Sequence, residues 1–231
     1  LRTISHDLRT PLTSISGNAN NLLYNESCLD AQMRRQIYGD IYDDSMWLIN
    51  LVENLLSVTR IEEGRMQIRQ SAELVDEVIK EALKHTGQSR TGRTIKVEEE
   101  DELILAKMDA RLIVQVLINL IGNAVKYTPQ GTDITVRVKK EKAENAERSQ
   151  VIISVCDLGN GIPDDRKERV FDMFYTGGNQ VADSRRSLGL GLGLCRSIIN
   201  AHGGKIWISD NIPHGAVVTF TLPAEEVALN E

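Results

Sequence analysis

Apolar residues recur every seven positions at the start of the chain, and this spacing most constrains its fold. The first series comprises Leu1, Leu8, Ile15 and Leu22, with Leu12 and Ala19 four residues after Leu8 and Ile15. After a polar break at residues 25–30, the second series comprises Ile37, Ile41, Leu48, Leu51, Leu55 and Val58. Such spacing places the apolar side chains along one face of a helix. The pattern predicts two long helices that form an antiparallel hairpin.

Each helix of this hairpin carries an apolar stripe that one neighbouring helix cannot cover. We therefore expect two copies to pair as a four-helix bundle, which makes the protein a homodimer. Pro11 lies inside the first helix. Because proline lacks a backbone donor, we expect it to bend or loosen the helix there.

After residue 68 the pattern changes to short strands and helices. Helices are predicted over residues 74–83, 110–127, 164–174 and 193–202, and strands over 94–97, 103–108, 134–138, 151–156, 205–209 and 216–222. Residues 66–71 read as a short connector, and the almost wholly apolar run 151–156 is typical of a buried central strand. We therefore predict a helical domain over residues 1–67 and a mixed α/β domain over residues 68–231.

Composition excludes several classes of function. Lys and Arg number 27 against 33 Asp and Glu, a net charge of -6 without a basic patch, and aromatic residues are only 4%. We therefore expect no nucleic-acid partner and no membrane contact by this part of the protein, which also lacks an apolar run of the roughly 18 residues that a spanning helix needs. The three cysteines (Cys28, Cys156 and Cys195) lie far apart in apolar surroundings, which indicates inert thiols.

The first predicted helix carries a candidate nucleophile in the string Ser5-His6-Asp7-Leu8-Arg9-Thr10-Pro11-Leu12. At ~100° per residue, His6 lies about 160° from the apolar stripe and faces water. An exposed imidazole beside a carboxylate is a usable nucleophile, because Asp7 can take or orient the proton on one ring nitrogen while the other attacks. The dipeptide by itself is explained better by a solvated polar face with a stray histidine.

Polar side chains on the helix predicted over residues 110–127 are candidates for binding metal and phosphate. Asn119, Asn123 and Lys126 share one flank of that helix. Carboxamide oxygens can hold Mg²⁺, and a lysine one turn on can meet phosphate. In isolation this spacing is more often an ordinary polar face.

Two glycine-rich segments are candidates for binding a nucleotide. Asp157, Gly159 and Gly161 directly follow the buried strand, where the acid can accept hydrogen bonds from an exocyclic amine and the glycines admit a flat base. Gly189, Gly191 and Gly193 open a helix whose backbone amides suit a phosphate. The second segment is neither a dinucleotide fingerprint nor a P-loop. The first segment, taken by itself, is explained equally well by a plain tight turn. The polar stretch between them includes Arg185 and Arg186 and suits a mobile lid, with a disordered loop as the alternative.

Taken together and in this order, these motifs resemble two-component sensor histidine kinases. The string from His6 resembles their H box, and the later segments resemble the N, G1, F and G2 boxes of the GHKL nucleotide-binding fold. The resemblance implies an α/β two-layer sandwich with a mixed sheet, and ATP and Mg²⁺ as cofactors. It also implies the following roles: Asn123 as the metal ligand, Asp157 as the adenine-recognising acid, Gly159 and Gly161 in G1, Phe171 and Phe174 in the F box, Gly189, Gly191 and Gly193 in G2, and Lys126 and Tyr127 on phosphate and base.

The resemblance further implies autophosphorylation of His6 and transfer of the phosphoryl group to an aspartate of a response-regulator receiver domain. Asp7, Arg9 and Thr10 would also assist the reverse reaction, hydrolysis of the phospho-aspartate. Residues 6–17 are similar to the potassium-responsive sensor kinases of the Kdp type, which implies a bacterial inner-membrane parent protein with this chain as its cytoplasmic portion. Because only five residues precede His6, we expect upstream helix to be missing.

Two other functions remain as alternatives. GHKL ATPases, such as heat-shock chaperones, carry a water-activating glutamate one turn before the metal-binding asparagine, where this chain has Asn119. An amide has no basic lone pair, which argues against that class. A catalytically silent dimeric scaffold is the second alternative. The segment at His214 departs from the family's glycine-rich final box, and we expect it to be structural only.

Overall fold

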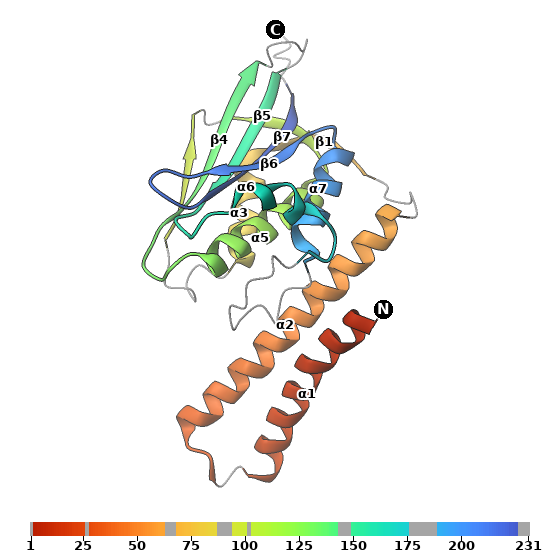
Figure 1. The fold of residues 1–231 in the computed structure, drawn as a ribbon, viewed down its shortest axis with the longest axis vertical. Helices are drawn as coiled ribbons and strands as arrows, with labels where there is room; N and C mark the ends of the chain where they lie inside the picture. Colours follow the sequence, from red (N-terminus) through yellow and green to blue (C-terminus); the bar gives the residue numbers. More distant parts are fainter. Residues whose placement is uncertain are drawn as a thin grey trace.

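The first two elements of the computed structural model are long helices. The structure describes residues 2–25, 28–62, 68–86, 94–100, 103–142, 149–175 and 189–225. Helix α1 spans Arg2–Tyr24 and helix α2 spans Ala31–Glu62. They lie side by side, with their connection at the end far from the rest of the chain (Figure 1). The predicted helical hairpin is confirmed.

Local interactions explain where the two helices end and begin. Asp30 accepts a hydrogen bond from the backbone N–H of Met33 at 2.7 Å, which is the arrangement of an N-cap for α2. Leu29 beside it is buried. Helix α1 continues through Pro11 as one helix, because the loss of one backbone donor does not end it.

The hairpin has a second apolar surface besides the seam between its helices. Leu12 belongs to the predicted seam but is 54% exposed, because it lies about 40° around the helix from Leu8. On α2, Leu51 is buried as predicted. Among the described side chains of α2, the large apolar ones that are exposed are Met33, Tyr38, Tyr42, Met46, Ile49, Val52 and Leu56.

A seven-stranded mixed sheet forms the rest of the chain with its helices. The strands are β1 (Ser71–Leu74), β2 (Ile95–Glu99), β3 (Leu105–Met108), β4 (Ile134–Lys142), β5 (Ser149–Cys156), β6 (Ile206–Asp210) and β7 (Ala216–Glu225). Their order is β1-β3-β7-β5-β4-β2, and β6 also pairs with β7. Among the strand pairs of the described residues, β2 and β4 run parallel and the other pairs run antiparallel. Strand β5 is central, as its apolar run predicts.

The structure corrects two predicted elements. Residues 71–74 form strand β1 on β3, and the next helix, α3, spans Val75–His85 instead of starting at residue 74. The helix expected over residues 164–174 is divided into α6 (Asp164–Lys167) and a 3-10 turn, η2 (Arg169–Phe171). Phe174, with φ of +67°, has a backbone conformation that no right-handed helix contains.

Helices α3, α5 (Ala110–Tyr127) and α7 (Gly191–Ala201) cover one face of the sheet (Figure 1). The layer of helices and the sheet form the predicted two-layer sandwich. Helices α5 and α7 run antiparallel: Val116 contacts Cys195, while Asp109 before α5 contacts His202 after α7. Within the described residues, the largest fully buried side chains of these three helices are Ile79, Ile113, Leu117, Leu120, Ile121, Leu194, Ile198 and Ile199. Each such side chain contributes about 1.5–3 kcal/mol through its burial.

The hairpin packs against this helical layer. Leu51 of α2 is 6% exposed and belongs to the same core as the residues of α5 and α7, and Leu8 and Trp47 pack against that core. Gln115 of α5 donates a hydrogen bond from Nε2 to Oδ1 of Asn54 at 3.1 Å. The hairpin therefore contacts α5 and α7 at its open end, the end that carries the start of α1.

Candidate active site

The turn after β5 is built around the carboxylate of Asp157. Its Oδ1 accepts backbone N–H groups from Gly159 at 2.8 Å and from Ala216 at 3.1 Å, and its own N–H donates to the carbonyl of Ala216. Within the described residues, both hydrogen bonds to this half-buried carboxylate end on Oδ1. Oδ2 therefore remains able to accept a hydrogen bond from a bound molecule.

Glycine at position 159 is required by the close approach of the backbone. A Cβ there would lie 2.6 Å from the carbonyl oxygen of Tyr127 and 3.0 Å from Oδ1 of Asp157. Gly161 adopts φ of +70°, which favours glycine. The turn therefore sits directly on the end of α5, where Lys126 and Tyr127 lie.

Helix α5 places its three predicted residues on the flank that leads to this turn. Asn119 and Asn123 are half-buried, Lys126 is half-buried with Nζ 5.3 Å from the ring centre of Tyr127, and Tyr127 is 53% exposed. The Nδ2 of Asn119 is buried beside the thiol of Cys195 and has no oxygen or nitrogen acceptor in the described part of the chain. An unsatisfied buried donor costs ~1–3 kcal/mol, which a bound acceptor would recover.

The first turn of α7 lies beside Asn119. A Cβ on Gly191 would be 3.5 Å from Oδ1 of Asn119. Helix α7 begins without a side-chain cap, so its first backbone N–H groups are available to an anion. The structure therefore brings the predicted asparagine and this predicted glycine loop together.

Phe174 and Tyr175 lie against Gly189, the first glycine of the loop that opens α7. Phe174 donates its backbone N–H to the carbonyl of Gly189 at 2.9 Å, and a Cβ on Gly189 would lie 2.4 Å from the carbonyl oxygen of Tyr175. Gly189 has φ of +65°. Arg185 and Arg186, predicted to belong to a lid, lie between Tyr175 and Gly189 in the sequence and outside the described residues.

Phe171 and Gly193 join η2 to α7. Phe171 is 2% exposed, and Arg196 of α7 lies over its ring at 5.6 Å. A Cβ on Gly193 would be 2.9 Å from Sδ of Met173 and 3.1 Å from the carbonyl oxygen of Phe171. These two predicted residues therefore act through packing, whereas the half-exposed Phe174 lies next to Gly189.

The thiol behind the site is inert. Cys195 is completely buried on α7 next to Asn119, and burial raises the pKa of its thiol to about 12. Burial likewise raises the pKa of Cys156. Cys28, by contrast, is exposed, which corrects the expectation of apolar surroundings for all three cysteines.

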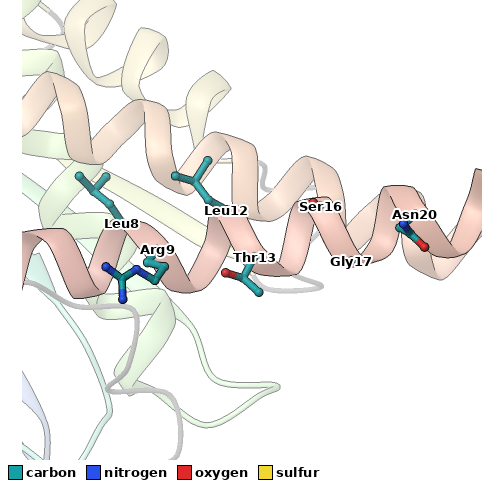
Figure 2. Close-up of a pocket in the computed structure, with 7 residues that line it drawn as sticks. All are labelled: Leu8, Arg9, Leu12, Thr13, Ser16, Gly17 and Asn20. Carbon is teal, nitrogen blue, oxygen red and sulfur yellow. The ribbon is translucent and has the colours of Figure 1, made fainter.

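The helical part of the predicted site lies on α1. His6 and Asp7 are within that helix, and their side chains lie outside what the structure describes. Arg9 and Thr10 are exposed. A groove of about 750 Å³ runs along this helix. Figure 2 shows the residues that line it, which are Leu8, Arg9, Leu12, Thr13, Ser16, Gly17 and Asn20.

Two further features are absent from the described part of the chain. It contains no group of three or more His, Cys, Asp or Glu side chains placed to hold a metal ion. Within the same residues, no helix combines the length and apolar character needed to cross a bilayer.

Sequence reasoning missed the groups that the backbone supplies to the site. The N–H of Ala216 donates to the carboxylate of Asp157, and the carbonyl oxygen of Tyr127 lies against Gly159 in the same turn. Every residue except proline has both backbone groups, so the amino-acid sequence does not indicate which of them contribute to a site. The glycine at position 215 was a weak sequence signal of a close backbone contact. In the structure, a Cβ there would lie 2.0 Å from the carbonyl oxygen of Asp157. That glycine indicates that β7 begins against the turn.

Two family models match the chain. Residues 1–64 match the His Kinase A (phospho-acceptor) domain, and residues 108–226 match the histidine kinase-, DNA gyrase B-, and HSP90-like ATPase. The first match contains α1 and α2. The second contains α5 and all the glycine turns described above.

Relatives and solved structures agree with these matches. The chain is 41% identical over 97% of its length to the sensor protein KdpD of Clostridium acetobutylicum and 32% identical over 97% to that of Escherichia coli K12, and it spans 24% of each. The chain thus spans about a quarter of the length of these relatives. It is 27% identical to the crystal structure of histidine kinase ThkA in complex with response regulator protein TrrA, with a TM-score of 0.64 over 96% of this chain and 60% of that one.

A hairpin that matches the phospho-acceptor domain thus precedes an ATPase domain whose predicted base and phosphate residues converge at one place. The chain therefore belongs to the histidine kinase-, DNA gyrase B- and HSP90-like ATPase family and has the two-domain core of a sensor histidine kinase.

Proposed function

We propose that the chain transfers the γ-phosphoryl group of ATP to His6 and then to an aspartate of a response-regulator receiver domain. One observation carries this proposal. Asp157 has Oδ1 occupied by two backbone N–H groups and Oδ2 open, directly beside glycines that admit a flat ligand, in a chain whose α1 carries His6. The division into residues 1–67 and 68–231 is part of the proposal.

The residues around this turn fit the adenine of ATP. The exocyclic amine of adenine is a donor, and Oδ2 of Asp157 is an acceptor that the backbone has already oriented. Gly159 and Gly161 have no side chain to obstruct the base, and the exposed ring of Tyr127 lies at the same end of α5. Glycine at position 159 lets the turn pack on the end of α5, because a Cβ there would lie 2.6 Å from the carbonyl oxygen of Tyr127.

The other end of the site fits the phosphates. The uncapped N-terminus of α7, with Gly191 and Gly193, offers backbone N–H groups, and Lys126 offers a positive charge. Within the described residues, the buried Nδ2 of Asn119 has no oxygen or nitrogen acceptor. A phosphate oxygen would provide one. Mg²⁺ bound to the side-chain oxygen of Asn123 would neutralise phosphate charge, since carboxamide oxygens suit hard cations.

His6 is the proposed nucleophile. Its ring nitrogen attacks the γ-phosphorus of ATP, a P–N bond forms, and the bond from that phosphorus to the ADP oxygen breaks. Asp7 accepts the proton that leaves the imidazole. For the reverse activity, we propose that Thr10 orients the water that hydrolyses the regulator's phospho-aspartate, with Asp7 and Arg9 assisting.

A second copy of the chain is the proposed partner of the hairpin. Seven large apolar side chains of α2 and Leu12 of α1 are exposed in one copy, more than an isolated soluble hairpin ordinarily leaves in contact with water. A four-helix bundle of two hairpins would cover them. The complex of the ThkA kinase with its response regulator supports the receiver domain as a further partner.

We further propose that the chain is the cytoplasmic portion of a bacterial inner-membrane sensor of the Kdp type. The identity to two KdpD sensor proteins supports this assignment. Asn119 supports kinase over ATPase activity, because an amide at this position cannot deprotonate water. A silent scaffold is disfavoured by the open acceptor of Asp157.

Incubation with γ-labelled ATP and Mg²⁺ tests the proposal, with the label mapped by mass spectrometry. We expect acid-labile, base-stable label on His6, and its loss in both His6→Gln and Asn123→Ala. The His6→Gln variant should still bind ATP, and His85→Gln, an exposed histidine on α3, should label normally. Steady phosphate release by His6→Gln at the wild-type rate would support an ATPase instead, and ATP binding without label would support a scaffold.

A further inference from the structure

A second turn closes against the turn at Asp157, and it belongs to no motif that the function uses. Residues 211–215 connect β6 to β7. Asn211 donates from Nδ2 to the carbonyl oxygen of Asp157 at 2.7 Å, and Nδ1 of His214 lies 3.2 Å from the carbonyl oxygen of Gly159. Both side chains thus reach across to the backbone that forms the proposed adenine pocket.

The direction of the His214 hydrogen bond is fixed by chemistry. A carbonyl oxygen only accepts, so Nδ1 of His214 must carry the proton and donate. The peptide groups around Gly159 are then held on both sides: its N–H donates to Oδ1 of Asp157, and its carbonyl accepts from His214. The side chain of His214 is itself exposed, so it adds little to the core.

The backbones of the two turns are also in direct contact. A Cβ on Gly161 would lie 3.2 Å from the carbonyl oxygen of Gly215, and Asn211 donates its N–H to that same carbonyl at 3.0 Å. The second turn therefore lies directly against the first.

We propose that Asn211 and His214 are positioning residues for nucleotide binding, which hold the carbonyls of Asp157 and Gly159 so that Oδ2 of Asp157 faces the base. This inference rests on the proposed function and reverses the expectation that the segment at His214 is structural only. His214 acts on the pocket without belonging to the fold's core. Its loss should therefore weaken nucleotide binding and leave the protein folded.

The test compares ATP binding and autophosphorylation by the whole chain in the wild type and in His214→Ala, His214→Gln and Asn211→Ala. We expect His214→Ala to raise the Kd and the KM for ATP about fivefold, the effect of one hydrogen bond. The labelling rate at saturating ATP should stay within about twofold, because the phosphate end of the site is untouched. His214→Gln, which keeps a donor, should restore at least part of the affinity.

Two comparisons separate this inference from its alternatives. In an Asp157→Asn background, His214→Ala should add no further loss of affinity, because the carboxylate it positions is gone. His85→Ala, at an exposed histidine of α3 whose ring lies 3.3 Å from Glu81, should bind ATP as the wild type does. If the wild type binds ATP and His214→Ala binds it equally well, the inference is wrong. If the wild type binds no ATP, the proposed function itself fails.

Discussion

Asn54 of α2 and Gln115 of α5 join the two domains by a side-chain hydrogen bond of 3.1 Å. The bond is partly buried, and Leu51 lies one turn before Asn54 in the shared core. Helix α5 also carries Asn119 and Asn123, one and two turns after Gln115. The hairpin is therefore attached to the same helix that supplies the proposed metal and phosphate residues.

The bond between Asn54 and Gln115 should be measurable as a coupling. We expect a coupling free energy of about 1 kcal/mol in a cycle of Asn54→Ala, Gln115→Ala and the double variant. Urea unfolding followed by the fluorescence of Trp47 and Trp207 would measure it. The exposed pair Gln36 and Asp40 on α2, bonded at 3.0 Å, is the control, with an expected coupling below about 0.5 kcal/mol. Equal values would contradict a special role of the interdomain bond.

His202 should stabilise the junction of α5 and α7. It is 2% exposed, Nδ1 donates to the carbonyl of Ile198 at 2.8 Å, and Nε2 accepts the N–H of Asp109 at 3.0 Å. Replacement by alanine leaves a buried N–H unpaired and a cavity, so we expect the free energy of unfolding to fall by about 2–4 kcal/mol. Asn200→Ala on the exposed side of α7 should change it by less than about 0.5 kcal/mol. Similar urea midpoints for both variants would disprove this role.

The accuracy of the sequence-based fold depended on how local each signal was. Strand β5 was predictable because its residues are apolar on both faces, and α5 because its apolar residues repeat at helical spacing. Strand β1 was not, because Ser71–Leu74 is a short edge strand with weak propensity. It forms through pairing with β3, more than thirty residues away.

The candidate site likewise contains residues that could be predicted from local sequence and contacts that could not. Asn119 and Gly191 could be placed near each other only through a family resemblance, since no local pattern relates α5 to α7. Asp157 was predicted from its position after β5, but the two N–H groups that occupy its Oδ1 became visible only with the fold. The role we propose for His214 rests on a contact between segments 55 residues apart.

The carboxylate of Asp157 should matter more for binding ATP than for stability. Asparagine keeps an oxygen for the two backbone N–H groups but replaces Oδ2 with a donor, which cannot accept from an amine. We expect Asp157→Asn to weaken ATP binding at least about tenfold, measured by calorimetry, while the free energy of unfolding changes by less than about 1 kcal/mol. Asp133→Asn, at an exposed ion pair with Lys96, should leave the affinity unchanged. Unaltered binding by Asp157→Asn would remove the basis for adenine recognition.

Thiol reactivity should separate the three cysteines. Burial raises the pKa of Cys195 to about 12, so its thiol stays protonated and unreactive at every pH below about 11, and the buried Cys156 is shifted in the same direction. At pH 8 we expect iodoacetamide to modify Cys28 in the native protein, and all three thiols in urea. Mass spectrometry would count the adducts, and Cys28→Ser should take up none while folded. Rapid native modification of Cys195 would show that α7 opens readily.

Two glycine-to-alanine changes should have opposite effects on stability. A Cβ at position 159 would lie 2.6 Å from the carbonyl oxygen of Tyr127, so the turn or the end of α5 must move. We expect Gly159→Ala to lower the free energy of unfolding by about 1–3 kcal/mol and to reduce ATP affinity at least about tenfold. A Cβ on Gly122, on the exposed face of α5, would meet no described atom within 4 Å, and Gly122→Ala should raise stability by about 0.5–1 kcal/mol through helix propensity. Gly122 directly precedes Asn123, and Gly159 lies in the turn at Asp157, so both are next to residues of the proposed ATP site. A loss of ATP binding in Gly159→Ala alone would assign the effect to the turn. Equal stability of the two variants would show that the turn tolerates a side chain.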